Sequence, residues 1–528
     1  MSQPEVSSPA GDVAELPQIP STHAPVQGQD WWRTELGARW PISVGIGLIL
    51  LFAFGVAAPL ADPDLPMHLA MGAWILRHRA VPWVEPFAWT RSGAPYFAYS
   101  WLPEVVYQLL YSYAGPVTLR VLHGLTQVAT GAAVVWLAYI NRWKSWTALI
   151  LIFLTVLVCA IITRFLRPQG ALMPLVLLCW ALGLRVLDSS QPVRWAIALA
   201  LAACTAANTH LLFPLTGLPL AVAITRTPVD KRRTLLIGAA LVAGWLTTPY
   251  GFVWPKVFVL NFGHNPLFDY PTPIVEFTPG FRFAIPDPVL LSLVVFLALI
   301  PWALKRSDLT PRERSVYGAM WVVGLVGFGL AVRAIVVWWL ATLPVIAVLL
   351  EKLPRPRTRA HERVLIATMA ALPVVLAIKF ARLDALLGGD ITPPARASVE
   401  PLAIWLDSHA KPRTGARPRL LTDFGYGSYL TWRLPAYSMS SDGRTIFPDS
   451  VALSDAYRFS DEGPIPLGPW RSADLAIEPL SVPIAAVLDT ARGWVRLGTV
   501  PVRRGVPLGA GLWAREAWLR TVALSHPR

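Results

Sequence analysis

PISVGIGLILLFAFGVAAPLADPD, residues 41–64, joins a run of uncharged residues to two aspartates. About 20 apolar residues in a helix cross the hydrocarbon core of a bilayer, so residues 41–60 are predicted to form a transmembrane helix. Asp62 and Asp64 follow directly, which places them at the surface of the membrane. The segment therefore predicts an integral membrane protein with acidic side chains at one face of the bilayer.

Further apolar runs follow along the chain. The composition agrees, because 15% of the 528 residues are charged, whereas roughly a quarter are charged in soluble proteins. We expect a mainly α-helical polytopic bundle of about 11 transmembrane helices, with a small C-terminal extramembrane α/β domain. The apolar runs lie at 41–60, 115–140, 146–163, 170–187, 194–208, 211–226, 234–248, 287–304, 315–331, 334–350 and 363–380.

The basic residues predict the orientation of the chain. The formal net charge is +14, and lysine and arginine concentrate in alternate short loops, as they do in the cytoplasmic loops of membrane proteins. With the N-terminus in the cytoplasm, an odd number of helices places the C-terminal region outside. Topology thus accounts for the charge, and we expect no nucleic-acid partner. The basic loops are 141–145, 185–194, 226–233, 305–314 and 351–363.

The chain divides into three regions. Residues 1–40 are rich in proline, glutamine and serine, which predicts a disordered cytoplasmic tail. Residues 41–380 are predicted to form the transmembrane domain, with a long first outer loop at 61–114. Residues 381–528 are predicted to form the outer domain. Within it we expect a helix near 401–408 and strands at 419–422, 428–432, 485–488, 494–499 and 511–515.

Asp62 and Asp64 are the first candidate site residues. Two carboxylates two residues apart face the same side of an extended chain. Such a pair suits a divalent cation such as Mg²⁺ or Mn²⁺, or one carboxylate takes a proton from an attacking hydroxyl group. Alternatively, Asp64 caps a helix that starts at Leu65–Pro66.

The rest of the first outer loop predicts a shelf on the membrane surface. His68 follows Asp64 by four residues, so both lie on one face of a helix over residues 65–79. An extended, proline-rich stretch that contains Glu85 follows, because the residue before a proline avoids helical backbone. A second amphipathic helix begins at Trp101 and runs to Tyr113, and both helices are expected to lie in the interface.

The run from Asp62 to Gly115 resembles the first periplasmic loop of bacterial membrane proteins related to GT-C glycosyltransferases. The acidic motif of that family is matched by Asp62 and Asp64. The resemblance covers most of the chain and includes Asn208–His210, Thr248–Gly251, Glu276–Phe277, Arg333, Asp423–Leu430 and Asp442–Arg444.

The resemblance implies a multi-pass inner-membrane enzyme that moves a sugar from a polyprenyl-phosphate carrier to a glycan, lipid or protein acceptor on the periplasmic face. The expected mechanism is inverting and uses no nucleotide cofactor. We assign Asp62 as the base and Asp64 as a supporting carboxylate or a ligand of Mg²⁺ or Mn²⁺. The predicted substrate-binding residues are His68, Glu85, Arg164, Arg167, Asn208, His210, Glu276 and Arg333.

Among these, a guanidinium at a helix end grips phosphate oxygens well, which favours Arg333, Arg164 and Arg167 for the phosphate, with His210 beside them. Lipid-headgroup anchoring is an equal alternative for Arg164 and Arg167. For Asp442–Arg444, a tight turn is favoured over a role in the site.

Two other classes of function stay open. The subgroup commonly has His-Glu before Trp101 and Asp before Pro86, whereas this sequence has Tyr99-Ser100 and Glu85. A scaffold that kept the fold without turnover would fit that departure. A transporter of a lipid-linked glycan is the other alternative, although transporters more often place ionisable residues in the middle of helices.

Overall fold

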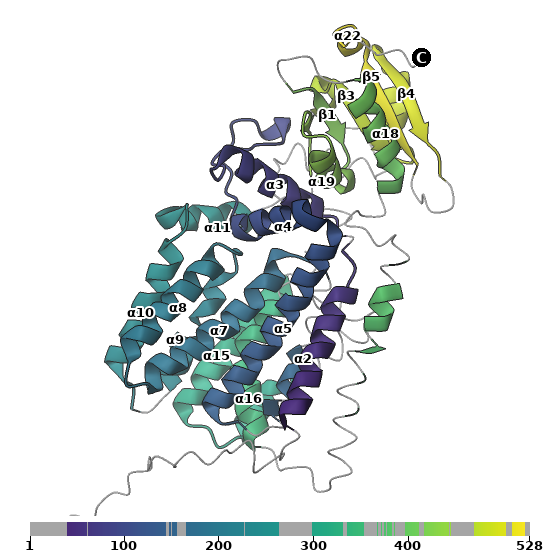
Figure 1. Ribbon diagram of the computed structural model, residues 1–528. Helices are drawn as coiled ribbons and strands as arrows, with labels where there is room; N and C mark the ends of the chain where they lie inside the picture. The colour runs from purple at the N-terminus through teal and green to yellow at the C-terminus, as the bar shows by residue number, and fades with distance from the viewer. Residues whose placement is uncertain are drawn as a thin grey trace, which may run out of the picture.

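The structure is a computed structural model, drawn in Figure 1. It describes residues 40–60, 62–143, 147–148, 150–155, 165–225, 228–262, 298–330, 335–352, 396–410, 417–442, 444, 469–502 and 509–522, with short pieces between 367 and 385. A helical bundle occupies the lower part of Figure 1, and a small domain with a sheet lies above it. The predicted N-terminal tail lies almost entirely outside the described residues.

Most helices of the bundle coincide with the predicted apolar runs, which confirms a mainly helical chain, but residues 251–262 are also helical and lie between two of those runs. Most of them run side by side in Figure 1. They are α2 (Trp40–Ala57), α5 (Pro116–Asn141), α7 (Pro168–Asp188), α8 (Pro192–Ala207), η3 (Phe213–Gly217), α9 (Leu218–Thr225), α10 (Lys231–Leu246), η4 (Gly251–Val253), α11 (Trp254–Phe262), α14 (Ile300–Arg306), α15 (Pro311–Leu330) and α16 (Ile335–Lys352).

The described part of the chain contains fewer clear membrane spans than expected. Among the described residues, α5 and α7 are long and apolar enough to cross a membrane, and α10 with α11 passes as a pair bent by 95°. The expected count of about 11 spans is therefore not reached. Prolines shorten the helices, as where Pro214 and Pro219 divide the run 211–226 into η3 and α9. Parts of the runs 146–163, 287–304 and 363–380 lie outside the described residues.

Glycines let the helices of the bundle approach closely. A Cβ on Gly55 of α2 would lie 2.7 Å from the Cα of Gly124 on α5. A Cβ on Gly244 of α10 would lie 2.5 Å from the backbone oxygen of Ala200 on α8. Small residues at crossings are how helices pack in membranes, where the hydrophobic effect between them is weak.

The first loop forms a layer across the end of the bundle nearest the small domain (Figure 1). It contains α3 (Leu65–His78), η2 (Trp89–Arg91) and α4 (Trp101–Ala114), which confirms both predicted helices. A Cβ on Gly72 would lie 2.1 Å from the backbone oxygen of Glu104, so α3 and α4 touch at their backbones there. This crossing brings the polar residues of the two helices together.

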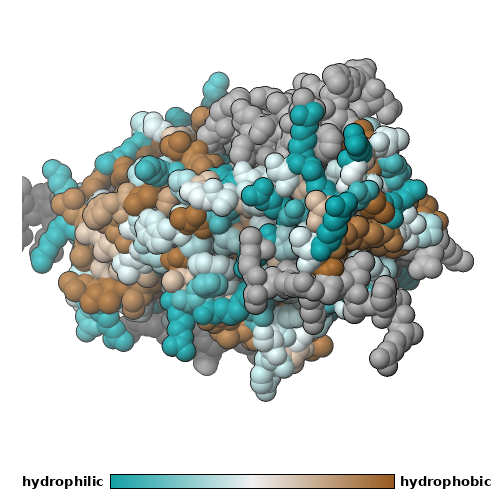
Figure 2. Space-filling view, turned by 90° about the horizontal axis from the view of Figure 1, so that it is seen from above, coloured by the Kyte–Doolittle hydropathy of each residue, from teal (hydrophilic) through white to brown (hydrophobic). Residues whose placement is uncertain are grey.

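The small C-terminal domain contains one mixed sheet with strand order β2-β1-β3-β5-β4. β1 is parallel to β2 and β3, and β5 is antiparallel to β3 and β4. Seen from this end, the surface mixes hydrophilic and hydrophobic residues (Figure 2). The elements are α18 (Arg396–His409), β1 (Arg419–Thr422), α19 (Phe424–Arg433), β2 (Ser438–Met439), η8 (Pro469–Ser472), β3 (Leu475–Pro479), α21 (Pro483–Thr490), β4 (Trp494–Val500), β5 (Ala510–Arg515) and α22 (Glu516–Leu519).

Three of the five predicted strands are confirmed, as β1, β4 and β5, and so is the helix near 401–408. The prediction for 428–432 is wrong, because the segment lies in α19, where Asp423 caps the helix by accepting from the N–H of Gly425. The prediction for 485–488 is also wrong, because Pro483 starts α21 there. The central strand β3 is not predicted from the sequence. It is buried on both faces, so it lacks the alternation of apolar and polar residues, and it contains Glu478 and Pro479, which are unusual in a buried strand.

Candidate active site

Asp62, Asp64 and Arg167 form a compact ionic cluster where α3 meets α7. The Nε of Arg167 donates to Oδ2 of Asp62 at 2.6 Å, and its Nη2 donates to Oδ1 at 2.9 Å. The same Nη2 lies 3.1 Å from Oδ2 of Asp64. The Asp62 side chain is fully buried, whereas the Asp64 side chain is 32% exposed. One guanidinium thus holds two carboxylates, and only one of the two is reachable from solvent.

Local sequence explains the placement of these groups. Asp64 occupies the N-cap position of α3, but its side chain makes no capping hydrogen bond. The alternative that Asp64 serves as a side-chain helix cap is therefore not supported. Its backbone N–H instead donates to Oδ1 of Asp62 at 3.1 Å. Arg167 is extended and precedes Pro168, the first residue of α7, as expected for a residue before a proline. The arginine therefore projects from the end of α7 toward the start of α3.

A second polar cluster lies on the facing sides of α3 and α4. Nδ1 of His68 is 3.0 Å from Oε1 of Glu104, and the rings of His68 and Tyr107 meet edge to face. Burial lowers the pKa of His68, but the hydrogen bond and charge of Glu104, with Asp64 and Asp62 further away, raise it overall above its usual value. His68 is therefore favoured as the charged partner of Glu104.

Asn208 and His210 lie at the end of α8, beside the start of α4. The indole N–H of Trp101 donates to Oδ1 of Asn208 at 2.6 Å, and Nδ2 of Asn208 donates to the backbone oxygen of Thr247 at 3.0 Å. Nδ1 of His210 accepts from the N–H of Leu212 at 3.1 Å. These contacts join the first loop to the bundle.

Glu85 lies at the junction with the C-terminal domain. Both of its oxygens accept from Arg444, at 2.7 and 2.9 Å, and Arg444 also donates to both oxygens of Asp442, at 2.8 and 2.6 Å. The guanidinium lies 4.9 Å from the ring centre of Tyr96. We call Glu85, Arg444 and Asp442 the Arg444 clamp.

The Arg444 clamp is buried and charge-assisted. The side chains of Glu85 and Asp442 are fully buried, and that of Arg444 is 12% exposed. Burial opposes ionisation of Glu85, but the charge and hydrogen bonds of Arg444 and two backbone N–H groups hold its pKa below the usual value. The expected Asp442–Arg444 turn is present, since the N–H of Arg444 donates to Oδ1 of Asp442. The turn also carries the arginine that joins the two domains.

Backbone contacts extend this junction. Ala88 pairs in parallel with Met439 of β2, and the N–H of Met439 donates to the oxygen of Phe87 at 3.2 Å. The first loop thereby adds one bridge to the edge of the sheet. On the other side of the loop, Trp432 of α19 packs against Tyr111 of α4. The C-terminal domain therefore contacts the same layer that carries the two clusters.

Three predicted site residues, Arg164, Glu276 and Arg333, lie outside the described residues. The structure brings Asp62, Asp64 and Arg167 together and places His68 beside them. Asn208 and His210 lie next to the start of α4, and Glu85 lies apart, in the Arg444 clamp.

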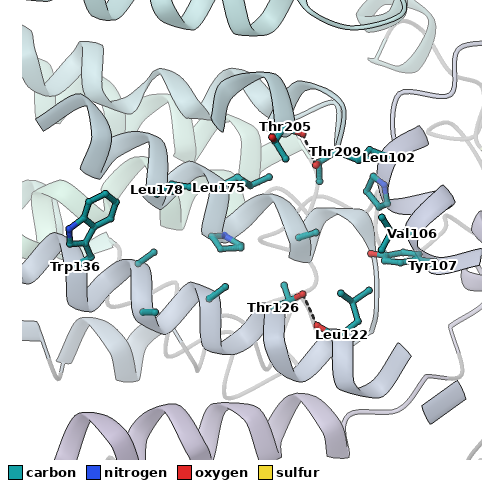
Figure 3. Close-up of a pocket in the computed structure, with 16 residues that line it drawn as sticks. Leu102, Val106, Tyr107, Leu122, Thr126, Trp136, Leu175, Leu178, Thr205 and Thr209 are labelled. Carbon is teal, nitrogen blue, oxygen red and sulfur yellow. Dashed lines mark hydrogen bonds between the residues drawn. The ribbon is translucent and has the colours of Figure 1, made fainter. Parts of the chain in front are cut away.

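A cavity of about 620 Å³ opens between α4, α5, α7 and α8, as shown in Figure 3. Its walls are mainly apolar, and it is large enough for a ligand of ordinary size. Tyr107 lies at one end, and its hydroxyl faces the cavity in Figure 3 without a hydrogen-bond partner in the structure. Ala171 and Pro174, in the first two turns of α7 after Arg167, line the same space. Further lining residues are Leu102, Val106, Leu122, Ala129, Trp136, Leu178 and Thr209.

The acidic pair does not fit a divalent cation in this arrangement. Both oxygens of Asp62 accept hydrogen bonds from Arg167, and Mg²⁺ requires about six oxygen ligands in octahedral order. Within the described residues, no group of three histidine, cysteine, aspartate or glutamate side chains is arranged to hold a metal.

The helical bundle, the helical first loop and the small C-terminal domain together have a GT-C-like fold, as the similarity to solved structures shows. ArnT from Cupriavidus metallidurans bound to undecaprenyl phosphate is similar, with a TM-score of 0.53, 14% identity, and coverage of 89% of this chain and 97% of that one. Archaeal oligosaccharyltransferase AglB from Archaeoglobus fulgidus, in complex with an inhibitory peptide and a dolichol-phosphate, has a TM-score of 0.60, 10% identity, and coverage of 85% and 70%.

Arabinofuranosyltransferase AftD from Mycobacteria also matches, with a TM-score of 0.53 and 16% identity over 90% of this chain. This chain spans 41% of the AftD chain. No family model matches the sequence, and no curated protein does. Identities this low show a shared fold, which confirms the GT-C-like fold expected from the sequence.

Sequence reasoning missed two residues of these clusters, Glu104 and Tyr107. Glu104 is the acidic residue in the first turn of α4, which is an ordinary place for a glutamate. One signal in the sequence could have indicated the helix crossing that brings Glu104 to His68. It is Gly72, four residues after His68, whose lack of a side chain lets α4 approach α3 closely.

Proposed function

We propose that this protein is a membrane glycosyltransferase that transfers a sugar from a polyprenyl-phosphate carrier to a glycan, lipid or protein acceptor. One observation carries the proposal: Tyr107, which lies close enough to Asp62 to feel the charge of its carboxylate, lines one end of a mainly apolar cavity. Such a reaction requires a carboxylate base near an apolar cavity that can hold the lipid carrier. We place the reaction on the periplasmic face of a bacterial inner membrane, as the loop charges favour.

The cavity supports a lipid-linked donor. Its walls are aliphatic side chains with Trp136 at a distance from the first loop, and Tyr107 supplies a hydroxyl at the end near His68. Burial raises the pKa of Tyr107, so its phenol stays protonated and donates a hydrogen bond. We place the isoprenoid chain in the apolar part of the cavity and the phosphate at the end where Tyr107 lies. ArnT and AglB are recorded with polyprenyl-type phosphates.

The geometry supports Asp64, rather than Asp62, as the base. Asp64 is the carboxylate that solvent reaches, and Asp62 has both oxygens occupied by Arg167. In the proposed step the acceptor oxygen attacks the anomeric carbon, its proton passes to Asp64, and the bond from that carbon to the phosphate oxygen breaks. Attack from the side opposite the phosphate inverts the anomeric centre. Asp62 and Arg167 hold Asp64 in place.

The departing phosphate needs positive partners. Arg164 and Arg333 remain our candidates for this role, together with the Tyr107 hydroxyl. His68 is a further candidate, since its charge is supported by Glu104.

An enzyme is favoured over the two alternatives by where the charges lie. The charged residues of both clusters lie near the ends of α3, α4 and α7, whereas transporters tend to place ionisable residues near the middle of the membrane. A scaffold does not require a ligand-sized cavity near the acidic pair.

Filling the cavity tests the proposal. Ala129→Phe places a ring in the cavity, and we expect undecaprenyl phosphate that co-purifies with the full-length protein to fall by about tenfold or more. Ala243→Phe, at an exposed position of α10, is the matched control and should leave the lipid content unchanged. The lipid is quantified by mass spectrometry. Equal lipid in both variants and the wild type would contradict the cavity assignment.

Tyr107→Phe gives an independent test of where the phosphate lies. The Tyr107 hydroxyl is buried and has no hydrogen-bond partner among the described residues, so its removal should leave protein stability unchanged or slightly higher. Binding of added undecaprenyl phosphate should weaken by about tenfold, the size of a lost hydrogen bond to a charged group. A thermal unfolding assay and a lipid titration measure the two effects. A variant that is less stable but binds the lipid normally would refute this position for the phosphate.

A further inference from the structure

We propose that the guanidinium of Arg167 takes the position that a divalent metal ion would occupy between Asp62 and Asp64. The pair is then held by a cation that belongs to the chain itself. The inference concerns the same site as the proposed function, but it stands on the geometry of three side chains, and its test measures metal binding.

The hydrogen bonds of Asp62 leave little room for a metal. Oδ2 accepts from the Nε of Arg167 at 2.6 Å, and Oδ1 accepts from the Nη2 of Arg167 at 2.9 Å and the N–H of Asp64 at 3.1 Å. The side chain has no solvent exposure. A metal ion that bound Asp62 would have to displace the arginine first.

Asp64 does not offer a metal an independent site. Its Oδ2 lies 3.1 Å from the same Nη2 of Arg167, so a cation at Asp64 would sit against a guanidinium of like charge. The one nearby histidine, His68, directs Nδ1 to Glu104. With Arg167 in place neither carboxylate is open to a metal, whereas without it two carboxylates and bound waters would supply oxygen ligands for Mn²⁺.

Arginine suits this position better than lysine. Its planar fork presents several N–H groups in fixed directions, which is how one side chain reaches both carboxylates. The backbone before Pro168 is restricted to extended conformations, which aims the side chain without a large loss of entropy. A tethered cation cannot be removed by a chelator, so its charge is present in every folded molecule.

Mn²⁺ binding by the full-length protein in detergent tests the inference, read by electron paramagnetic resonance. The wild type and the Asp62→Asn variant should bind the same amount of Mn²⁺. Arg167→Gln frees two carboxylates and should gain one Mn²⁺ site per chain, and Asp62→Asn combined with Arg167→Gln should lose that site.

Arg167→Gln leaves buried carboxylates without a cation, so it risks failing to fold. Arg167→Lys serves in that case, because its single nitrogen leaves carboxylate oxygens open, and it should gain a Mn²⁺ site that the wild type lacks. A wild-type site that Asp62→Asn abolishes would overturn the inference. So would a folded arginine variant that gains no Mn²⁺.

These outcomes are separate from the proposed function. Suppose that the wild type binds no Mn²⁺ at Asp62, that the arginine variant gains Mn²⁺, and that the wild type shows no polyprenyl-phosphate binding and no sugar transfer. The Arg167 inference then holds and the glycosyltransferase proposal fails.

Discussion

Asp64→Asn is expected to lower sugar transfer by about 10²–10⁴-fold, the usual contribution of a general base. An amide of the same shape keeps its place near Arg167 but cannot accept the proton of the acceptor hydroxyl. Asp64 is partly exposed, so the substitution should not disturb insertion or folding. Transfer is measured in the native host, together with the amount of lipid-linked sugar that accumulates.

Asp407→Asn on α18 is the matched control, because Asp407 is 54% exposed and far from the cluster in the sequence. It should transfer sugar at the wild-type rate. Asp62→Asn should also lose transfer, but with lower stability, since it leaves Arg167 without its main partner. Wild-type transfer by an inserted Asp64→Asn protein would refute Asp64 as the base. Loss of transfer without accumulated donor would favour a scaffold or a transporter.

Arg444→Ala is expected to weaken the docking of the C-terminal domain on the first loop by about 3–5 kcal/mol, the cost of removing one partner of a buried ion pair. The reason is that Glu85 and Asp442 would stay buried with no cation between them. The stacking of Arg444 on Tyr96 would be lost as well. Hydrogen exchange of residues 84–97 and 438–442 should rise sharply in the variant.

Arg496→Ala gives the comparison for the Arg444 clamp. Arg496 pairs with Asp489 at 3.1 Å, but both side chains are well exposed, at 46% and 34%. Exposed pairs contribute about 0–1 kcal/mol, so exchange should barely change. Equal, small changes in both variants would show that the Arg444 clamp does not hold the domain.

The Arg444 clamp also bears on the site, because the stretch it holds connects α3 to α4. If the clamp opens, the crossing at Gly72 that pairs His68 with Glu104 is less constrained. Arg444→Ala is therefore expected to reduce transfer as well, while leaving undecaprenyl phosphate binding in the cavity closer to normal.

The sequence predicted the local features of this protein well. Apolar runs located most helices of the bundle, and the four-residue spacing of Asp64 and His68 placed His68 on α3, one turn after Asp64. The proximity of Asp62 and Asp64 follows from their spacing of two residues in the sequence. Each of these inferences depends on neighbours along the chain.

The partners of those residues could not be predicted, because they come from distant segments. Arg167 is 105 residues from Asp62, and Arg444 is 359 residues from Glu85. Arginines and acids of the right types are present in the sequence, but nothing in it indicates which of them meet. Arg167 was therefore assigned to a phosphate or to lipid headgroups, and Glu85 to a substrate. The cavity depends in the same way on four helices that pack only in the folded chain.

The location of bound undecaprenyl phosphate tests the central claim most directly. Electron cryo-microscopy of the full-length protein with this lipid should show its phosphate between Tyr107 and Asp64, with the isoprenoid chain running along α5 and α7 toward Trp136. Density for the phosphate at another surface, with the cavity occupied by nothing or by side chains, would contradict the proposed reaction at this site.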